Sequence, residues 1–346
     1  MPRDLRYRLL GRSGLRVSEL ALGTMTFGTE WGAGADAPES RRIFDAYAKR
    51  GGNFIDTANR YTEGTSEKLV GKFIASDRDH FVLASKYTLF DRKGDPNFSG
   101  NHRKNLFRSV AGSLARLGTE YLDLLWVHMW DFTTPVEEVM RALDDLVRQG
   151  LVHHVGVSDT PAWVASQANM LAALRGWSPF VARQLRYSRI DRAAERDLLP
   201  MAGALDLAVT PWSVLGAGVL SGKYNADKNA TGRAAQGAAR NSHNLEIAAL
   251  VNGVAAELGA TASQVAVAWV MSSPGVVIPI IGARSVAQME DNLGAVDLTL
   301  TATQIEGLDL ATAIDLGFPH EFLQLDYVRD LYSGATHALL DREPRR

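Results

Sequence analysis

Short runs of apolar and β-branched residues recur along the chain, and stretches with helical punctuation separate them. Runs of this length bounded by turn signals are typical of strands buried in a parallel sheet. We predict eight such strands, at residues 20–23, 53–56, 81–85, 122–127, 154–157, 181–184, 207–210 and 276–280. A strand followed by a helix, repeated around the chain, predicts an α/β protein built as one closed (β/α)8 barrel, the TIM-barrel architecture. The pattern shows no break in composition, so residues 1–346 are expected to form a single domain.

Proline and glycine mark the ends of two predicted helices. The stretch Thr134-Pro135-Val136-Glu137 has the pattern of a capping box with proline at the first helical position, and Gly150 marks the end of that helix. Thr160 and Pro161, with Gly176 further on, repeat the same arrangement. Both helices would fill gaps between predicted strands.

Two segments lie outside the repeated pattern. Residues 7–17, with the turn residues Arg12, Ser13 and Gly14, predict an N-terminal β-hairpin that could plug the N-terminal end of the barrel. The stretch 216–244 is rich in glycine, alanine and asparagine, and a loop of this length is usually functional or mobile.

A doubly wound sheet is the alternative architecture. Such a sheet normally carries a glycine fingerprint for a dinucleotide after its first strand. Here the first strand leads into Gly23-Thr24-Met25-Thr26-Phe27-Gly28, which does not match. The glycines between residues 216 and 222 have the wrong spacing and follow the seventh strand, so we set this alternative aside.

Composition narrows the classes of partner. The chain has 37 Lys and Arg residues against 39 Asp and Glu residues, and a net charge of −2 gives no basic surface for nucleic acid or an anionic membrane. The chain has no cysteine, which excludes disulfides, thiolate metal sites and thiol nucleophiles, and we assign no metal to it. The N-terminus lacks the apolar core of a signal peptide, and no apolar run approaches the roughly 20 residues of a spanning helix. We therefore expect a cytoplasmic protein.

Candidate chemistry gathers at the ends of three consecutive strands. Asp56 follows the second strand, Lys86 the third and His128 the fourth, and Tyr61 lies on the loop behind Asp56. Barrel enzymes carry their catalytic groups at these strand ends, so the four side chains should meet. An ammonium group beside a phenol lowers the pKa of the phenol, and a carboxylate would hold the ammonium charged. We therefore expect Lys86 to make Tyr61 more acidic.

Each of these residues taken alone has a structural explanation. Asp56 could cap a loop, Lys86 could be a solvated strand end, His128 could be a core histidine and Tyr61 a packed aromatic. Their joint placement on neighbouring strand ends favours a catalytic role.

The stretch Asp56-Thr57-Ala58-Asn59-Arg60-Tyr61, with Ser85-Lys86 and Val127-His128, resembles the catalytic tetrad of the aldo-keto reductase superfamily. The resemblance extends over residues 7–300. It implies that Tyr61 is the general acid, that Lys86 and Asp56 tune it, and that His128 orients a carbonyl group. It also implies that a nicotinamide cofactor supplies the hydride without a Rossmann domain.

The resemblance assigns the nicotinamide end of the cofactor to the next strand ends. Ser158, Asp159 and Gln184 match positions that hold the carboxamide, although asparagine is more usual at the position of Asp159. Trp212 matches the aromatic residue that stacks on the nicotinamide ring. As an isolated residue, Trp212 would equally suit a packed core.

The rest of the cofactor is assigned in the same way. The resemblance gives the pyrophosphate loop to Ser213, Leu215, Gly216, Gly218 and Lys223, with Arg233 as a clamp. It assigns the adenosine end of the cofactor to Gly282, Arg284, Gln288, Asp291 and Asn292. Arg284 implies that the cofactor is NADPH and that NADH binds more weakly. The glycines of the first group would also suit a flexible turn, and Ser285 with Gln288 would also form a capping box.

The sequence therefore predicts an NADPH-dependent carbonyl reductase that converts a small aldehyde or ketone to an alcohol. Two alternatives remain: a cofactor-binding redox sensor like the potassium-channel beta subunits of this superfamily, and a Schiff-base lyase with Lys86 as nucleophile. Aromatic and apolar residues near the strand ends are candidates for the substrate pocket, namely Met25, Phe27, Trp31, Met129, Trp130 and residues 318–322. The sequence leaves open the identity of the carbonyl compound, the preferred direction and the oligomeric state.

Overall fold

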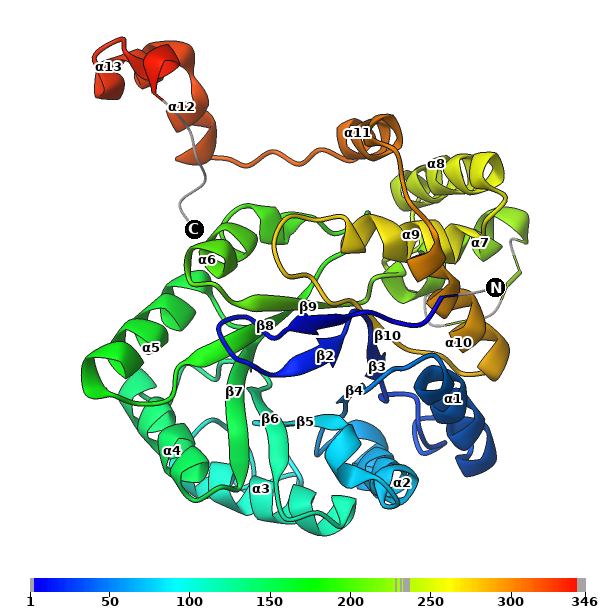
Figure 1. Ribbon diagram of the computed structural model, residues 1–346, viewed down its shortest axis with the longest axis vertical. Coiled ribbons are helices and arrows are strands. Elements are labelled where there is room, and N and C mark those ends of the chain that lie inside the picture. The colour runs from blue at the N-terminus through cyan, green and yellow to red at the C-terminus, as the bar shows by residue number, and fades with distance from the viewer. Residues whose placement is uncertain (1–2, 228, 231, 233–236, 341–346) are drawn as a thin grey trace.

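The computed structural model describes residues 3–227, 229–230, 232 and 237–340, and its centre is a ring of parallel strands with helices outside it (Figure 1). The strands of the ring are β3 (Ala21–Gly23), β4 (Phe54–Asp56), β5 (Val82–Tyr87), β6 (Leu122–Val127), β7 (Val152–Ser158), β8 (Phe180–Arg186), β9 (Ala208–Trp212) and β10 (Ile280–Ile281). They pair in parallel in the order β10-β3-β4-β5-β6-β7-β8-β9. The predicted (β/α)8 barrel is confirmed.

The barrel closes between β9 and β10, where the eighth strand differs from its predicted range of 276–280. Only two residues form a regular strand, because Pro279 has no N–H to continue the ladder. The residues before β10 still bridge its neighbours: the N–H of Val209 donates to the carbonyl of Val276 at 2.8 Å, and the N–H of Ala21 donates to the carbonyl of Pro279 at 2.9 Å. The closure is therefore made by irregular chain.

Helices cover the outside of the ring. In chain order they are α1 (Ala37–Lys49), α2 (Thr65–Ile74), α3 (Arg103–Leu117), α4 (Val136–Arg148), α5 (Ala162–Arg175), α6 (Leu198–Ala204), α7 (Lys223–Ala226), α8 (Ser242–Leu258), α9 (Ala262–Met271) and α10 (Val286–Leu293). The two predicted threonine caps are wrong in detail, because Pro135 and Pro161 are the N-cap residues of α4 and α5. The hydroxyl of Thr134 instead donates to Asp131 at 2.8 Å, and that of Thr160 donates to the carbonyl of Ser158 at 2.7 Å.

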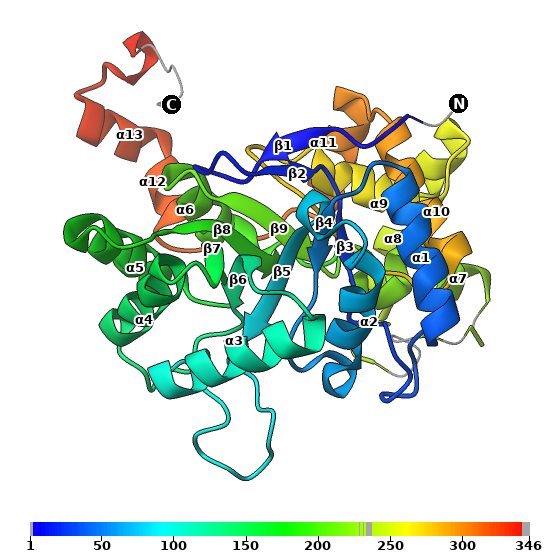
Figure 2. The same ribbon diagram turned by 60° about the horizontal axis from the view of Figure 1, so that its bottom comes forward.

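The predicted N-terminal hairpin is present at the end of the barrel opposite the long loops (Figure 2). Strands β1 (Tyr7–Leu9) and β2 (Arg16–Ser18) pair antiparallel. Leu10 is fully buried, and Gly11 has a left-handed φ of 55°. A Cβ at Gly11 would lie 2.1 Å from the carbonyl oxygen of Val181 in β8, so only glycine fits this approach. The hairpin therefore closes the N-terminal end of the barrel.

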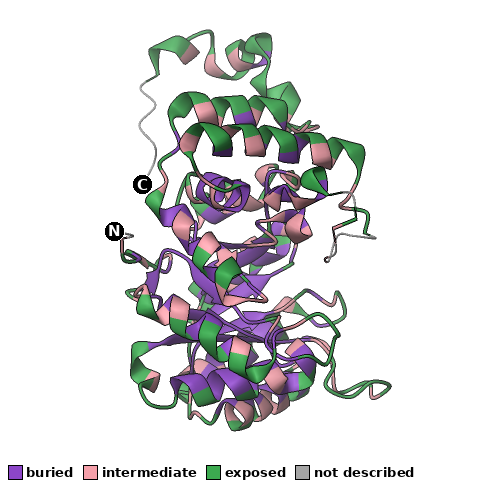
Figure 3. Cartoon of the chain, turned by 90° about the vertical axis from the view of Figure 1, so that its right-hand side faces the viewer, coloured by how far each residue is buried: buried purple, intermediate pink, exposed green. Residues whose placement is uncertain are grey.

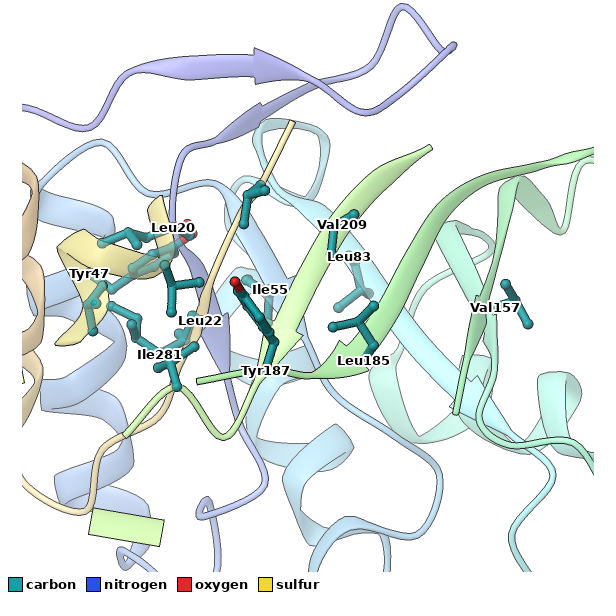
Figure 4. Packing of buried hydrophobic residues seen from close by; sticks show 14 of the residues in the cluster. Leu20, Leu22, Tyr47, Ile55, Leu83, Val157, Leu185, Tyr187, Val209 and Ile281 are labelled. Atoms are coloured by element: carbon teal, nitrogen blue, oxygen red, sulfur yellow. The ribbon is translucent and has the colours of Figure 1, made fainter. Parts of the chain in front are cut away.

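The core has two layers. Inside the ring, Phe54, Val82, Leu124 and Trp126 form one cluster with Leu10 of the hairpin. Outside it, side chains of successive strands pack toward the helices, as the labelled residues of Figure 4 show. In Figure 3 the strands are coloured mostly as buried, and the helices carry exposed residues as well as buried ones. The side chains at the carboxyl ends of these strands therefore stand on a rigid frame.

Three helices follow the barrel: α11 (Ala302–Ala311), α12 (His320–Gln324) and α13 (Asp326–Ser333). In Figure 1, α12 and α13 lie away from the barrel at the end of an extended connection. Phe318 is 79% exposed and Phe322 is 42% exposed. Residues 318–322, expected as pocket wall, therefore lie on this outer segment.

Among the described residues, no single helix has both the length and the apolar composition to cross a membrane, and α8 with α9 meet that test only as a pair bent by 96°.

Candidate active site

A cavity of about 500 Å³ opens at the carboxyl ends of the strands. Three of the four predicted catalytic residues, Asp56, Tyr61 and His128, line it. The fourth, Lys86, is fully buried beneath and bonds to Asp56. The structure thus brings together the four residues predicted from strand ends.

The ammonium group of Lys86 has three neighbours. It forms an ion pair with Oδ2 of Asp56, donates to the carbonyl of Thr57 at 2.9 Å and lies 4.7 Å from the centroid of the Tyr61 ring. Both Lys86 and Asp56 are buried, where an unpaired charge would be costly. Burial lowers the pKa of Lys86, but Asp56 and Tyr61 outweigh this effect and hold the pKa above its ordinary value. Lys86 is therefore a fixed cation.

A strained turn positions Tyr61. The next two residues, Thr62 and Glu63, have left-handed φ angles of 46° and 56°. Such angles are unfavourable for residues with a Cβ and persist only where the surroundings hold them. The hydroxyl of Thr62 donates to the carbonyl of Phe27 at 2.6 Å and accepts from the N–H of Ser66 at 3.1 Å. These bonds fix the turn, and with it the phenol at the cavity.

Lys86 lowers the pKa of Tyr61 as expected, but the net pKa is not lowered. Burial raises the pKa of Tyr61, and although Lys86 acts in the opposite direction, the pKa stays above its ordinary value. The negative charge of Asp56 also raises it. Desolvation of the phenolate therefore outweighs the nearby cation. Tyr61 keeps its proton, which is the state that a proton donor requires.

His128 stands edge-on to Tyr61, with ring centroids 6.0 Å apart. Burial, with a smaller effect of the Lys86 charge, lowers the pKa of His128 to about 3. Its Nδ1 atom is buried and has no hydrogen-bond partner in the part of the chain that the structure describes. At neutral pH the imidazole is uncharged, so it can orient an oxygen atom but does not supply a proton by titration.

The residues predicted for the nicotinamide carboxamide lie beside this group. Gln184 donates from Nε2 to Oδ1 of Asp56 at 2.9 Å, which joins it to the catalytic cluster. Because a carboxylate only accepts, the amide oxygen of Gln184 must point away from Asp56. The hydroxyl of Ser158 is buried without a partner among the described residues. The indole N–H of Trp212 donates to Oδ1 of Asp159 at 3.2 Å, and both residues line the cavity.

Most residues predicted for the pyrophosphate lie along the same cavity. Ser213, Leu215, Gly218 and Lys223 line it, and a Cβ at Gly218 would lie 3.6 Å from the Lys223 ammonium. Gly216 faces the core instead, because a Cβ there would lie 2.3 Å from Ile190. Arg233 lies outside the described residues.

The predicted adenosine end is built around the start of α10. Gly282, Arg284, Gln288, Asp291 and Asn292 all line the cavity. Ser285 caps α10 as expected, but the side chain of Gln288 accepts from the N–H of Arg284 at 2.9 Å, so the capping box is incomplete. Asp291 accepts from Thr261 at 2.7 Å, and Asn292 donates to the carbonyl of Gly282 at 3.3 Å.

Arg284 stands apart in this group. Among the described residues, no carboxylate pairs with its guanidinium group. Glu39 of α1 accepts from the N–H of Val286 at 2.7 Å and so occupies the first donor of α10. The side chain of Arg284, rather than the helix N-terminus alone, is therefore the group available to an anion.

The pocket wall differs in part from the prediction. Met25 and Trp31 line the cavity, and the Trp31 ring is edge-on to Tyr61 at 6.5 Å. Phe27 is fully buried and packs edge-on against Phe73 of α2, and Trp130 belongs to the same core cluster. Tertiary packing, rather than distance along the chain, places these two rings in the core.

The cavity wall also contains residues that we did not predict, among them Arg60 and Leu89. Arg60 lies directly before Tyr61 in the sequence, and its guanidinium group sits 4.5 Å from the Phe90 ring. Proximity to Tyr61 could have indicated Arg60. Leu89 carries no comparable signal, because an apolar residue after a strand is common.

These residues fit a dinucleotide. The cavity joins the catalytic cluster at one end to Arg284 at the other. The partnerless hydroxyl of Ser158 and the unpaired guanidinium of Arg284 are both groups that a carboxamide and a phosphate would satisfy. A cofactor with these two ends would lie along the cavity.

Comparisons with known proteins agree with this geometry. The family model described as the aldo/keto reductase family matches residues 19–312. A norsolorinic acid reductase of Aspergillus flavus is 39% identical over 328 residues, which cover 92% of this chain and 84% of that protein. An aryl-alcohol dehydrogenase [NADP(+)] of Phanerodontia chrysosporium is 37% identical over 331 residues, covering 89% and 86%. An aldo-keto reductase of Aspergillus calidoustus is 38% identical over 342 residues, covering 93% and 85%.

Proposed function

We propose that the chain, which belongs to the aldo/keto reductase family, is an NADPH-dependent carbonyl reductase with Tyr61 as proton donor. Membership of the family, with relatives that are reductases and dehydrogenases, makes the chain an oxidoreductase that acts on C=O and CH–OH groups. The proposal adds the cofactor, the direction and the residues. The observation that carries it is the position of Tyr61 at the cavity, where its ring lies 4.7 Å from a buried ammonium that Asp56 holds.

NADPH, when bound, supplies a hydride to the carbonyl carbon. As negative charge develops on the carbonyl oxygen, Tyr61 gives its proton to that oxygen. Lys86 stabilises the phenolate that remains, and Asp56 keeps Lys86 charged and in place. The neutral imidazole of His128 holds the carbonyl oxygen beside the phenol.

NADPH is favoured over NADH by Arg284. Its guanidinium group is unpaired among the described residues and can bind a phosphate in a bidentate manner. Glu39 already occupies the Val286 N–H, so the contact with a 2′-phosphate would fall mainly to Arg284.

An aromatic aldehyde or ketone is the substrate class that we propose. Trp31 and Met25 give the cavity an aromatic and apolar wall next to Tyr61. One of the relatives is named as an aryl-alcohol dehydrogenase, and an aryl alcohol carries an aromatic ring. We keep the cytoplasm as the proposed location.

The Schiff-base alternative is disfavoured by the state of Lys86. A lysine nucleophile must lose its proton, whereas Asp56 and Tyr61 outweigh burial and raise the pKa of Lys86. Its ammonium group is also held by Asp56 and by the carbonyl of Thr57. A redox-sensing role would need tight NADPH binding without turnover, and the complete proton-donating cluster favours catalysis.

The test compares the native protein with Tyr61→Phe in NADPH oxidation with a panel of aromatic aldehydes. Loss of the proton donor should lower kcat by roughly 10²–10⁴-fold. The dissociation constant of NADPH should stay within about twofold, because Tyr61 is assigned to the proton and not to cofactor binding.

Tyr7→Phe is the matched control, because Tyr7 is 51% exposed on the hairpin at the opposite end of the barrel. It should leave kcat unchanged. Unchanged turnover in Tyr61→Phe would remove Tyr61 as the acid. Tight NADPH binding with no turnover of any carbonyl by the native protein would favour the sensor.

A further inference from the structure

Asp159 occupies an unusual position at the reaction end of the cavity. It follows β7 directly and has a left-handed φ of 37°, a conformation in which Asp and Asn are the most tolerated residues with a Cβ. Its backbone is bonded on both sides: its N–H donates to the carbonyl of Gln184 and its carbonyl accepts from the N–H of Trp130, each at 3.4 Å. The turn therefore aims one acidic side chain at the cavity.

The carboxylate of Asp159 has a defined partner. The indole N–H of Trp212 donates to its Oδ1 at 3.2 Å. An asparagine in the same place could accept that bond through its own Oδ1 and has nearly the same shape. Aspartate and asparagine would therefore fit this position equally well. They differ here in charge.

Burial and neighbouring charges both affect the pKa of the Asp159 carboxyl group. Burial raises the pKa of Asp159 and outweighs the Trp212 bond and the positive charges of Lys86, Arg183 and Arg186, which act to lower it, so the pKa lies above its ordinary value. The negative charge of Asp159 also raises the pKa of Tyr61 slightly, so the two groups interact across the cavity. Asp159 thus lies within electrostatic reach of the site of hydride transfer, because Tyr61 must adjoin the reacting carbonyl.

The two redox states of the cofactor differ in charge at that site. The nicotinamide ring is positively charged in NADP⁺ and neutral in NADPH, whereas the rest of the molecule is the same. A fixed anion near the ring attracts only the oxidised form. We propose that Asp159 sets the redox-state preference of the cofactor site by favouring NADP⁺ over NADPH. This inference rests on the proposed function, because it requires the nicotinamide to lie beside Tyr61.

The preference has consequences for both directions of the reaction. Tighter binding of NADP⁺ slows its release after carbonyl reduction and lets the enzyme oxidise alcohols at lower NADP⁺ concentration. An enzyme with a neutral amide in this place would release NADP⁺ more readily. Asp159 is therefore a specificity residue for the cofactor and has no part in proton transfer.

The test measures dissociation constants of NADP⁺ and NADPH separately by calorimetric titration, for the native protein and for Asp159→Asn. The ratio of the NADP⁺ constant to the NADPH constant should rise roughly three- to tenfold in the variant, the size expected for one partly screened charge pair. The change should come mainly from weaker NADP⁺ binding. Because the two ligands share every phosphate, general effects on the site cancel in the ratio.

Asp45→Asn is the matched control, because Asp45 lies on the outer face of α1 with 51% of its side chain exposed. It removes the same charge and should leave the ratio unchanged. Binding of both cofactors by Asp159→Asn with an unaltered ratio would overturn the inference and leave the proposed function intact. Failure of the native protein to bind either cofactor would overturn both.

Discussion

The two ends of the cavity hold their charges in opposite ways. At the reaction end, Lys86 and Asp56 are buried and bonded to each other. At the adenosine end, Arg284 is only partly buried, and its guanidinium group has no carboxylate partner among the described residues. A buried pair is costly to break, whereas an unpaired surface cation costs the fold little. Substitutions at the reaction end should therefore lower the free energy of unfolding. At the adenosine end, Arg284 is available to distinguish one ligand from another.

Breaking the buried pair should have the largest effect. Lys86→Met leaves the Asp56 carboxylate buried with Gln184 as its remaining side-chain donor, so we expect a loss of about 3 kcal/mol in the free energy of unfolding. Carbonyl reduction should fall at least as far as in Tyr61→Phe. Denaturant titration followed by circular dichroism measures the stability.

Two variants serve as controls for Lys86→Met. The double variant Asp56→Asn/Lys86→Met removes the stranded charge and should regain much of the lost stability without regaining activity. Asp45→Asn breaks an exposed pair with Arg41 and should cost less than about 1 kcal/mol. If Lys86→Met lost as little free energy of unfolding as Asp45→Asn, the buried pair at the reaction end would not contribute to stability as we propose.

His128 should make the reaction end sensitive to acid. Its pKa is about 3 in the folded protein against an ordinary value of 6.5, so the unfolded chain binds a proton first as the pH falls. Stability is complete above pH 6.5 and is lost as the pH falls toward 3, by about 2 kcal/mol at pH 5. Unfolding free energies measured at pH 7.5 and pH 5 test this.

His128→Gln lacks the titrating group and should lose about 2 kcal/mol less than the native protein between these two pH values. The difference between the two proteins separates the contribution of His128 from those of the carboxylates and the other histidines. An identical loss in both would mean that the imidazole titrates at its ordinary pKa in the folded state.

Removal of the unpaired cation should affect binding and leave the fold unchanged. Arg284→Ala should weaken NADPH binding about tenfold, the value of one charge-assisted contact, and leave NADH binding and the unfolding free energy nearly unchanged. Isothermal titration with both cofactors measures this. Arg41→Ala on α1 is the control, and equal losses for NADPH and NADH would remove the 2′-phosphate from Arg284.

The smallest effect is expected at Glu39, which brings a negative charge to the start of α10. Glu39→Gln can still accept the Val286 N–H but no longer repels a phosphate nearby. NADPH should bind about two- to threefold more tightly, with NADH unaffected. Weaker NADPH binding in this variant would show that Glu39 supports the site through its geometry.

Much of the fold could be predicted from the sequence. The buried strands appear as short apolar runs, and parallel pairing then brings Asp56, Lys86 and His128 to one end of the barrel. The first and last residues of the eighth strand could not be predicted in this way. Its pairing depends on the main chain around Pro279 and on the neighbouring strands β9 and β3 at the same time. The threonine caps failed for a similar reason: competing acceptors such as Asp131 become available only after folding.

Pocket residues were harder to predict than catalytic residues. Met25, Phe27 and Trp31 lie within a few residues of one another, yet Phe27 packs into the core and the other two line the cavity. A ring buried in a core and a ring in a pocket wall have the same apolar sequence signal. Only the position of α2, which supplies Phe73, separates them.

The sequence by itself determined which groups meet, because strand order and the ends of the strands follow from its apolar pattern. Tertiary structure decided how those groups behave. Whether Lys86 or burial controls the pKa of Tyr61 depends on how completely water is excluded, and burial prevails. The bond from Gln184 to Asp56 joins residues far apart in the chain. Desolvation and long-range contacts arise only in the assembled barrel, so no local pattern of residues encodes them.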